Sequence, residues 1–402
     1  MYNDKMIHQA VKVRIYPNSE QKVILAQNFG SARWWWNYAL NKCIETYKAT
    51  GKGLTRTAMN SMLPKLKKEK ETEWLKDCYS QIYQSVSLNL SRAYLNFFAG
   101  RARYPRFKSK FGKQSIQYPQ NVSRSEIGLK FPGRLGNVKA KIHRPLEGEL
   151  KTVTVSMTNS GKYFASILLE KKGDYPEVGS QDKVIGIDLG IKDFAITNDG
   201  KKTSKYANPR HLKRHHRNLK RKQQKLARKQ KGSNSRNKAR KLVAKVYERI
   251  SNVRQDFLHK LSRKIVNNNQ VVVVENLHIK GMVCNHKLAK AISDCSWGTF
   301  VNLLEYKLKE EGKVLLEIDR FFPSSKTCSN CHHQIDKLPL DIRNWSCSHC
   351  GKEHDRDENA AINIRQEGIR ILKLSPLGTS GAADGGDVRP RRGNISRLGS
   401  SL

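Results

Sequence analysis

Residues 328–331 read CSNC and residues 347–364 read CSHCGKEHDRDENAAINI, and these two segments decide the architecture of the C-terminal half. Each begins with a C-x2-C pair, and two such pairs at this separation can wrap one tetrahedral zinc ion. Four thiolates complete the coordination and leave no open position, so the predicted zinc is structural. Its ligands would be Cys328, Cys331, Cys347 and Cys350. Asp355 and Asp357 follow closely, so a rigid zinc site would hold a carboxylate in a fixed place.

A redox or disulfide arrangement is the main alternative for these cysteines, and the paired spacing favours zinc over it. Any one of four nearby histidines can replace a ligand, although the all-cysteine set is complete: His332, His333, His349 and His354. The remaining cysteines lack such spacing and are interpreted as structural thiols: Cys43, Cys78, Cys284 and Cys295. Eight cysteines used in this way indicate a reducing, intracellular environment.

The charge of the chain indicates a polyanionic partner. Its 402 residues carry 76 Lys and Arg against 35 Asp and Glu, a formal net charge of +41, and are enough for two or three domains. Nucleic acid is the favoured partner because each neutralised phosphate releases counterions. A ribosome-associated protein or a binder of acidic lipid surfaces is the less favoured alternative. We expect no membrane span and no signal peptide, because the chain lacks a long apolar run.

The N-terminal half is predicted to combine helices with a small sheet. Residues 10–16 alternate as a strand, and helical spacing of apolar residues runs over 20–48 and 74–98, on either side of a Lys-rich, poorly patterned piece at 63–70. Short strands separated by Gly and Pro then indicate a small β-barrel or sandwich: 115–119, 128–132, 138–145, 150–158 and 163–170. The N-terminal strand would join this sheet, with the helices inserted between.

The second half alternates buried strands with helices. After a linker that ends near Asp182, residues 184–198 predict two strands, and the acid-free stretch 201–247 predicts a long basic helix. Four valines at 271–274 predict a fully buried strand. A helix over 289–310, a strand over 313–319 and a disordered tail over 373–402 complete an α+β, multidomain reading.

Three acids stand in comparable settings. Asp188 ends the strand VIGID, Glu275 ends VVVVE, and Asp355 or Asp357 opens the helix after the cysteines. Each alone is more often a surface or salt-bridged residue, or one that complements a helix dipole. Burying a lone carboxylate is costly unless it is paired or metal-bound, so their joint occurrence in so basic a chain predicts shared cations. Two Mg²⁺ ions on such carboxylates can hydrolyse a phosphodiester in line.

These segments resemble the OrfB/TnpB family, encoded by bacterial and archaeal insertion sequences and related to type V CRISPR effectors. The resemblance rests on GIDLGIKDFAI (186–196), VVVVENLHIKGM (271–282) and the segment from 347 to 364, with support from YPNSEQ (16–21), WWWNYALN (34–41) and YPRFKSK (104–110). It covers about residues 11–372. It implies that Asp188, Glu275 and Asp357 form the catalytic triad, with Asp357 preferred because the D-x-N-A-A-x-N pattern starts there.

The family's fold is a RuvC nuclease of RNase H type with a zinc ribbon set into it. The resemblance places a wedge-like β-barrel at 1–17 and 101–180 and a helical recognition domain at 18–100. The nuclease domain would then comprise 181–320 and 351–372, with the zinc ribbon at 321–350. What the family implies is an RNA-guided DNA endonuclease. It would bind a noncoding guide RNA and double-stranded target DNA beside a short motif, and would use two Mg²⁺ ions, replaceable by Mn²⁺, in a prokaryotic cytoplasm.

Candidate nucleic-acid contacts come from three places. Four cations in the acid-free stretch would neutralise phosphates, with a solvated charged helix as the alternative: Arg214, Arg217, Lys220 and Arg221. Phe107 and Lys108 would contact RNA or duplex, and Tyr79, Gln81 and Gln84 would help read the adjacent motif. The run Trp34–Trp36 is predicted to pack in the core or between domains rather than to stack on bases.

Three other functions remain open. A transposase or accessory DNA-binding protein of the insertion sequence would join DNA as well as bind it, although no motif marks a tyrosine as its nucleophile. A nuclease-inactive, RNA-guided repressor would occupy DNA without cutting, and the intact acidic set argues against it. A structure-specific resolvase would act without RNA.

Overall fold

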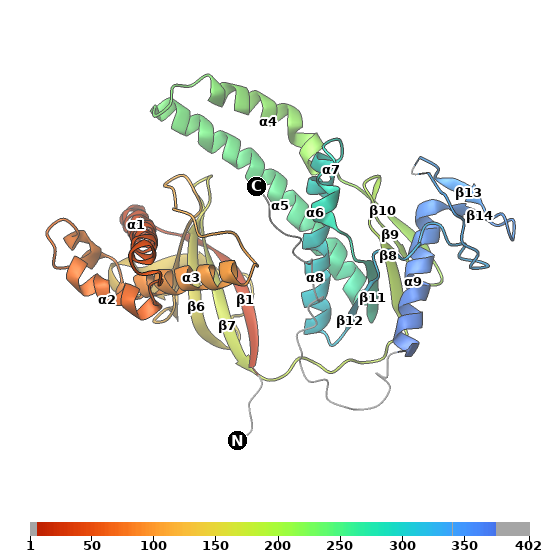
Figure 1. Ribbon diagram of the computed structural model, residues 1–402, viewed down its shortest axis with the longest axis horizontal. Coiled ribbons are helices and arrows are strands. Elements are labelled where there is room, and N and C mark those ends of the chain that lie inside the picture. The colour runs from red at the N-terminus through yellow and green to blue at the C-terminus, as the bar shows by residue number, and fades with distance from the viewer. Residues whose placement is uncertain (1–5, 340, 375–402) are drawn as a thin grey trace. The chain divides into compact units, whose positions relative to one another are not determined.

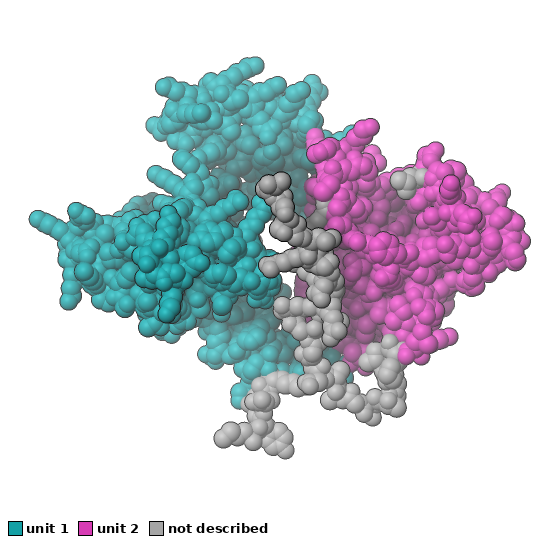
Figure 2. Space-filling view, in the orientation of Figure 1, with its two compact units in different colours: residues 1–177, 211–257 teal, residues 178–210, 258–402 magenta. Residues whose placement is uncertain are grey.

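The computed structural model describes residues 6–339 and 341–374 and divides into two compact units (Figures 1 and 2). The first unit comprises residues 1–177 and 211–257, and the second comprises 178–210 and 258–402. The predicted tail at 373–402 lies outside the described residues from 375 onwards. Within the part of the chain that is described, no helix combines the length and apolar character needed to cross a membrane.

The first unit is built on a seven-stranded antiparallel sheet. Its order is β2 (Gln114–Tyr118), β6 (Glu149–Met157), β7 (Tyr163–Lys172), β1 (Met6–Tyr16), β5 (Gly136–Lys141), β4 (Gly128–Phe131) and β3 (Ser123–Ser125). The short 3-10 helix η2 (Gly133–Leu135) links β4 to β5. β1 pairs with both β7 and β5, which confirms that the N-terminal strand joins the later strands. Buried residues alternate along β7, as expected for a sheet with one face in the core.

The helices of this unit lie between β1 and β2 in sequence. α1 (Ser19–Thr50) begins with a capping box, in which Asn18 and Gln21 satisfy each other's backbone N–H groups. The poorly patterned reading of 63–70 was incomplete, because α2 (Arg56–Leu66) is capped by Thr55 and buries apolar residues at helical spacing. The second predicted helix begins later than expected: η1 (Glu73–Asp77) is a 3-10 turn, and α3 is Ser80–Phe98.

The basic stretch forms two helices rather than one. α4 (His211–Ala227) and α5 (Asn234–Asn268) run side by side in a helical hairpin (Figure 1). They pack through a small apolar core made of Leu219, Val243, Val246 and Ile250. The prediction of a single long helix over 201–247 is wrong because the chain turns at Gly232, whose φ of 87° is readily adopted only by glycine.

The second unit contains a five-stranded mixed sheet. Its order is β10 (Thr203–Ala207), β9 (Asp193–Asn198), β8 (Val184–Asp188), β11 (Val271–Glu275) and β12 (Val314–Ile318). β11 is parallel to β8 and to β12, whereas β9 is antiparallel to its neighbours. The first four residues of β8 and of β11 are buried, because helices cover both faces of the sheet.

Helix α9 (Arg356–Leu374) packs directly on this sheet, and Figure 1 shows α8 (Trp297–Glu310) on the other side of the strands. The close approach of α9 requires glycine at two places, Gly186 on β8 and Gly368 on α9. The helix predicted at 289–310 is interrupted: α7 (Ala289–Cys295) ends at Ser296, whose φ is 57°, before α8 begins. The short helix α6 (Ile279–Met282) precedes α7, and β13 (Asn344–Ser346) pairs with β14 (Glu353–Asp355).

Candidate active site and zinc site

The three predicted catalytic acids lie at one edge of the five-stranded sheet. β8 and β11 are parallel neighbours, with Ile187 opposite Val274, so their terminal acids Asp188 and Glu275 meet at the same end. Asp357 lies in the first turn of α9, which packs against both strands. The carboxyl ends of parallel strands are the usual place for a functional site in sheets of this kind.

Electrostatics show that the three carboxylates interact. Loss of water around its carboxylate, together with the negative charges of Glu275 and Asp357, raises the pKa of Asp188 to about 8. Arg356 and Arg343 oppose this rise only in part. Burial also raises the pKa of Glu275, against a hydrogen bond from the Ser324 hydroxyl. Acids that repel one another at a desolvated strand end fit a divalent cation, which would supply the missing positive charge.

The two aspartates after the cysteines have different partners, which separates their roles. Asp355 caps α9: its Oδ1 accepts hydrogen bonds from the backbone N–H groups of Asp357 (3.0 Å) and Glu358 (3.1 Å). Its Oδ2 accepts a further bond from Lys205 at 2.9 Å. Burial acts against ionisation, but these partners lower the pKa of Asp355 overall. Asp355 is thus a helix cap, and Asp357 remains the acid that faces Asp188.

Arg343 is a site residue that sequence reasoning missed. Its Nη1 lies 3.0 and 3.1 Å from the two carboxylate oxygens of Asp357. Its carbonyl accepts a 2.7 Å hydrogen bond from the backbone N–H of Arg356, at the start of α9. No spacing rule links residue 343 to residue 357, so only the fold reveals the pair.

The four predicted zinc ligands come together. The Sγ atoms of Cys328, Cys331, Cys347 and Cys350 all lie within 4.8 Å of one another, and no other group of three or more possible ligands in the described residues is as compact. Cys328 and Cys350 are 3.7 Å apart at sulfur, and Cys331 and Cys347 are 3.6 Å apart. Tetrahedral zinc with Zn–S bonds of about 2.3 Å requires sulfurs about 3.8 Å apart, so the set fits that ion.

His354 supports the zinc site rather than completing it. Its Nε2 lies 3.1 Å from Cys328 Sγ, the distance of a hydrogen bond, and its ring packs on Trp345 with centroids 4.8 Å apart. Such contacts orient metal ligands and tune their basicity. Apolar residues around the cysteines form a small separate core with Leu338 and Trp345.

The predicted phosphate contacts are accessible. All four cations are exposed on α4: Arg214, Arg217, Lys220 and Arg221. A basic cavity of about 470 Å³, which the sequence did not single out, lies at the hairpin tip between α4 and α5. It is lined by Lys222, Lys225, Arg228, Lys229, Lys238 and three further residues. The same surface therefore extends beyond the four predicted positions.

The residues predicted to contact duplex or RNA differ in their surroundings. Phe107 is 57% exposed, whereas the Lys108 ammonium lies 3.7 Å from the centre of the Trp36 ring, where burial lowers its pKa to about 8. Tyr79 accepts a hydrogen bond from Asn121 and stacks on Tyr118, while Gln84 is exposed. These contacts leave Phe107 and Gln84 as the freest of the set.

The tryptophan run packs internally, as predicted. Trp35 is fully buried and donates a 2.9 Å hydrogen bond to Ser87 Oγ. Trp36 is also buried and donates to the carbonyl of Arg106. Trp34 stacks on Tyr38 with ring centroids 5.0 Å apart. The run therefore joins α1 to α3 and to the segment that carries Phe107.

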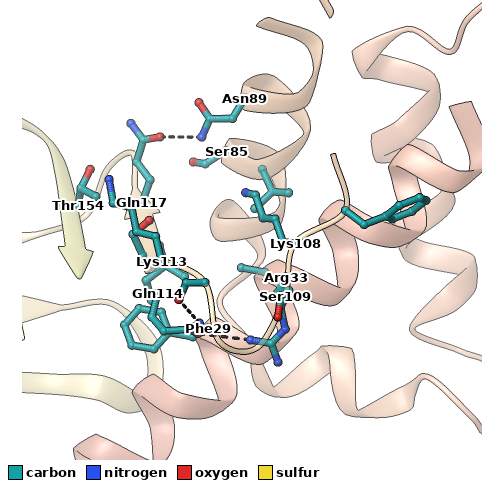
Figure 3. Close-up of a pocket in the computed structure, with 16 residues that line it drawn as sticks. Phe29, Arg33, Ser85, Asn89, Lys108, Ser109, Lys113, Gln114, Gln117 and Thr154 are labelled. Carbon is teal, nitrogen blue, oxygen red and sulfur yellow. Dashed lines mark hydrogen bonds between the residues drawn. The ribbon is translucent and has the colours of Figure 1, made fainter. Parts of the chain in front are cut away.

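A polar cavity of about 520 Å³ opens between α1, α3 and β2 (Figure 3). Asn89 on α3 donates a 3.2 Å hydrogen bond to Gln117, and Arg33 on α1 donates a 3.3 Å bond to Gln114. Sequence reasoning chose Tyr79, Gln81 and Gln84 on α3 instead, and it had no signal for Asn89 or the β2 glutamines. The cavity brings together the side chains that recognise base edges most often.

Comparison with known proteins gives a consistent picture. A family model described as a probable transposase, OrfB_IS605, matches residues 165–286, and a Cas12f1-like TNB domain model matches 297–364. A model described as a helix-turn-helix domain matches residues 6–52, which here form the strand β1 and the single long helix α1.

Two curated relatives match over nearly their whole length. A Streptomyces pristinaespiralis protein named "Putative RNA-guided DNA endonuclease" is 38% identical, over 99% of this chain and 96% of its own. The Escherichia coli (strain K12) protein "Putative RNA-guided DNA endonuclease InsQ" is 29% identical, over 93% and 95%. Among solved structures, a Cas12f1–sgRNA–target DNA complex aligns with a TM-score of 0.54 at 14% identity, covering 90% of this chain and 99% of that one. This last likeness shows a shared Cas12f-like fold.

Proposed function

Because this chain belongs to the OrfB/TnpB family, we propose that it is an RNA-guided DNA endonuclease of a transposable element. The observation that carries the proposal is the meeting of Asp188, Glu275 and Asp357 at the carboxyl end of two buried parallel strands. A binding protein without catalysis has no use for three acids that raise one another's pKa there. Its full-length relatives bear the same functional name.

The strand order and directions of the second unit support a RuvC-type, RNase H-like nuclease domain. Three strands are parallel, and β9 and β10 form an antiparallel edge beside β8. The cysteine cluster supports the zinc ribbon at 321–350, inserted before α9. In the first unit, the seven-stranded sheet corresponds to the proposed wedge domain at 1–17 and 101–180, and α1 to α3 correspond to the recognition domain at 18–100. The hairpin at 211–257, which the sequence placed in the nuclease domain, groups with this unit.

Asp188, Glu275 and Asp357 would hold two Mg²⁺ ions, or Mn²⁺ in their place. When bound, these ions would supply an activated water and stabilise the leaving oxygen of the phosphodiester. The chain's own residues set the positions of the acids. The Ser324 hydroxyl orients Glu275, and the Arg343 guanidinium holds Asp357. No side chain is needed as a covalent nucleophile.

The partners would be a noncoding guide RNA and double-stranded DNA that carries a short motif beside the target. The exposed cations of α4 and the basic cavity at the hairpin tip would contact phosphates without reading sequence. The cavity in Figure 3 offers amides, which pair with adenine, and Arg33, which pairs with guanine; together with Tyr79, Gln84 and Phe107 it is our candidate region for reading the motif. We place the protein in a prokaryotic cytoplasm, at the nucleoid when bound to DNA.

The test begins with the material that copurifies with the protein. Sequencing its RNA should reveal a uniform scaffold with a variable guide, and a plasmid with a matching target should be cut in Mg²⁺. Asp188→Ala should abolish cleavage while guide and target binding persist. Asp182→Asn, an exposed acid just before β8, is the matched control and should cut normally. Retained cutting by Asp188→Ala would contradict the mechanism.

A transposase is the second candidate, favoured by the printed description of the OrfB_IS605 model. It predicts strand-transfer products joined to a new DNA site in the same assay. Cleavage products alone would exclude it. Binding without cleavage would favour the repressor, and cutting without any RNA would favour the resolvase.

A further inference from the structure

Ser324 contacts a catalytic acid from a different segment of the chain. It lies before the first zinc ligand and is only 7% exposed. Its hydroxyl donates a hydrogen bond to Oε1 of Glu275, at the end of β11. A carboxylate with one oxygen held in this way keeps lone pairs free for a cation but loses its freedom to rotate.

Two buried asparagines of α9 hold the backbone around Ser324. Asn363 Nδ2 donates to the carbonyls of Ser324 (2.7 Å) and Thr327 (2.6 Å). Asn359 Nδ2 donates to the Thr327 carbonyl at 2.8 Å, and its Oδ1 accepts from the backbone N–H of Ser329 at 2.9 Å. The two asparagines are 1% and 2% exposed. They lie one turn apart on the helix that also carries Asp357, so α9 fixes this loop to its own first turn.

The same loop continues directly into the zinc site. Cys328 lies between Thr327 and Ser329, the residues that the asparagines bind, and its backbone N–H bonds to the His333 carbonyl at 2.9 Å. One end of the loop therefore touches Glu275, and the other supplies a thiolate to zinc. This arrangement places a short, fully bonded segment between the metal site and the acid.

We propose that Ser324 is a positioning residue for Glu275, and that the Asn359–Asn363 pair transmits the order of the zinc ribbon to that carboxylate. The inference rests on the proposed function, since it assigns Glu275 to cation binding. It goes further in giving the zinc ribbon a second point of action, on Glu275 as well as on Asp357. Partners of this kind, which orient a metal ligand, typically account for roughly 10–100-fold in metal affinity or activity.

The experiment compares hydroxyl removal at two adjacent serines in the RNA-bound protein. Ser324→Ala removes the group that touches Glu275, and Ser325→Ala removes the same group one position further along. Ser324→Thr and Ser324→Val form an isosteric pair that differs only in the hydroxyl. For each variant we would measure the Mg²⁺ midpoint of plasmid cleavage, Mn²⁺ affinity by calorimetry without target DNA, bound zinc, and guide RNA binding.

The expected result is a shift of about tenfold or more in both the Mg²⁺ midpoint and the Mn²⁺ affinity of Ser324→Ala, with zinc content and RNA binding unchanged. Ser325→Ala should match the wild type, and Ser324→Thr should bind Mn²⁺ more tightly than Ser324→Val. If Ser324→Ala fails to fold, the Thr and Val pair decides. Equal metal affinity for that pair, or for the two alanine variants, would overturn the proposal.

The assay also separates this inference from the function on which it rests. If the wild type binds Mn²⁺ but cuts no target, the proposed function fails, and the Mn²⁺ titrations still test Ser324. If the wild type cuts and the Ser324 variants behave like their controls, only the positioning role is wrong.

Discussion

Replacing Gly186 with alanine should separate α9 from the sheet and disturb the active site. Gly186 lies on β8, two residues before Asp188, and faces α9. A Cβ at this position would lie 2.4 Å from the carbonyl oxygen of Ala361 and 2.5 Å from the backbone N of Arg365. These are helix backbone atoms, so they cannot rotate away as a side-chain tip would.

The size of the effect follows from the geometry. An ordinary contact begins at 3.4 Å, so the deficit of 3.4 minus 2.4 Å requires α9 to retreat by about 1 Å. Overpacking of this kind typically costs about 1–3 kcal/mol of stability. In a domain of this size that lowers the melting temperature by roughly 2–12 °C. The retreat would carry Asp357, one turn before Ala361, away from Asp188, and a misplacement of 1 Å can cost about 100-fold in rate.

The assay combines thermal unfolding with single-turnover plasmid cleavage by the RNA-bound protein. Gly179→Ala is the matched control, because its Cβ would meet nothing within 4 Å. We expect Gly186→Ala to melt earlier and to cut far more slowly, and Gly179→Ala to behave as the wild type. A Gly186→Ala protein with the stability and rate of its control would refute the claim that this close contact places Asp357.

Three further predictions concern other parts of the molecule. Cys347→Ser should lose stoichiometric zinc by mass spectrometry and lose cleavage with it, because three thiolates no longer close the tetrahedron; normal cutting would contradict the bracing role. Glutamine at the four exposed cations of α4 should weaken guide binding and flatten its salt dependence by up to about 0.9 in log–log slope per lost phosphate contact, and an unchanged slope would show that they touch no phosphate: Arg214, Arg217, Lys220 and Arg221. Burial lowers the pKa of Lys307 from 10.5 to about 8, so between these values the unfolded chain holds the extra proton and the free energy of unfolding should rise with pH. Denaturant titrations at pH 7.5 and 9.5 should show this rise, at most about 1.4 kcal/mol per pH unit, and Lys307→Met should remove that contribution; equal pH dependence in both proteins would contradict the assignment.

The sequence predicted those elements whose signal is local. Residues 184–188 and 271–275 are buried on both faces, so they appear as unbroken apolar runs, and the acid at each end marks the sheet edge. The cysteine spacing carried the zinc ligands for the same reason, since a C-x2-C pair closes on one ion almost irrespective of what surrounds it. Both features need no knowledge of distant residues.

The errors have a different physical origin. The break at Ser296 depends on a left-handed backbone that serine seldom adopts, and no periodicity forecasts it. Helix α2 was missed because its lysines obscure three buried residues, and Pro64 lies within its last turn. Arg343 and Ser324 were missed because each acts through a single tertiary contact from an otherwise polar loop. Such residues become visible only when the chain brings them to the acids.

The contacts of the three acids argue that the zinc ribbon prepares two of them and leaves the third to the sheet. Glu275 is held by Ser324 and Asp357 by Arg343, and both partners lie within the proposed ribbon at 321–350. Asp188 sits at the end of β8, where the strand itself fixes its backbone. Removing zinc should therefore leave the five-stranded sheet folded and Asp188 in place while Glu275 and Asp357 lose their orientation. Cation binding, rather than the fold of the sheet, is then the property that depends on the cysteines.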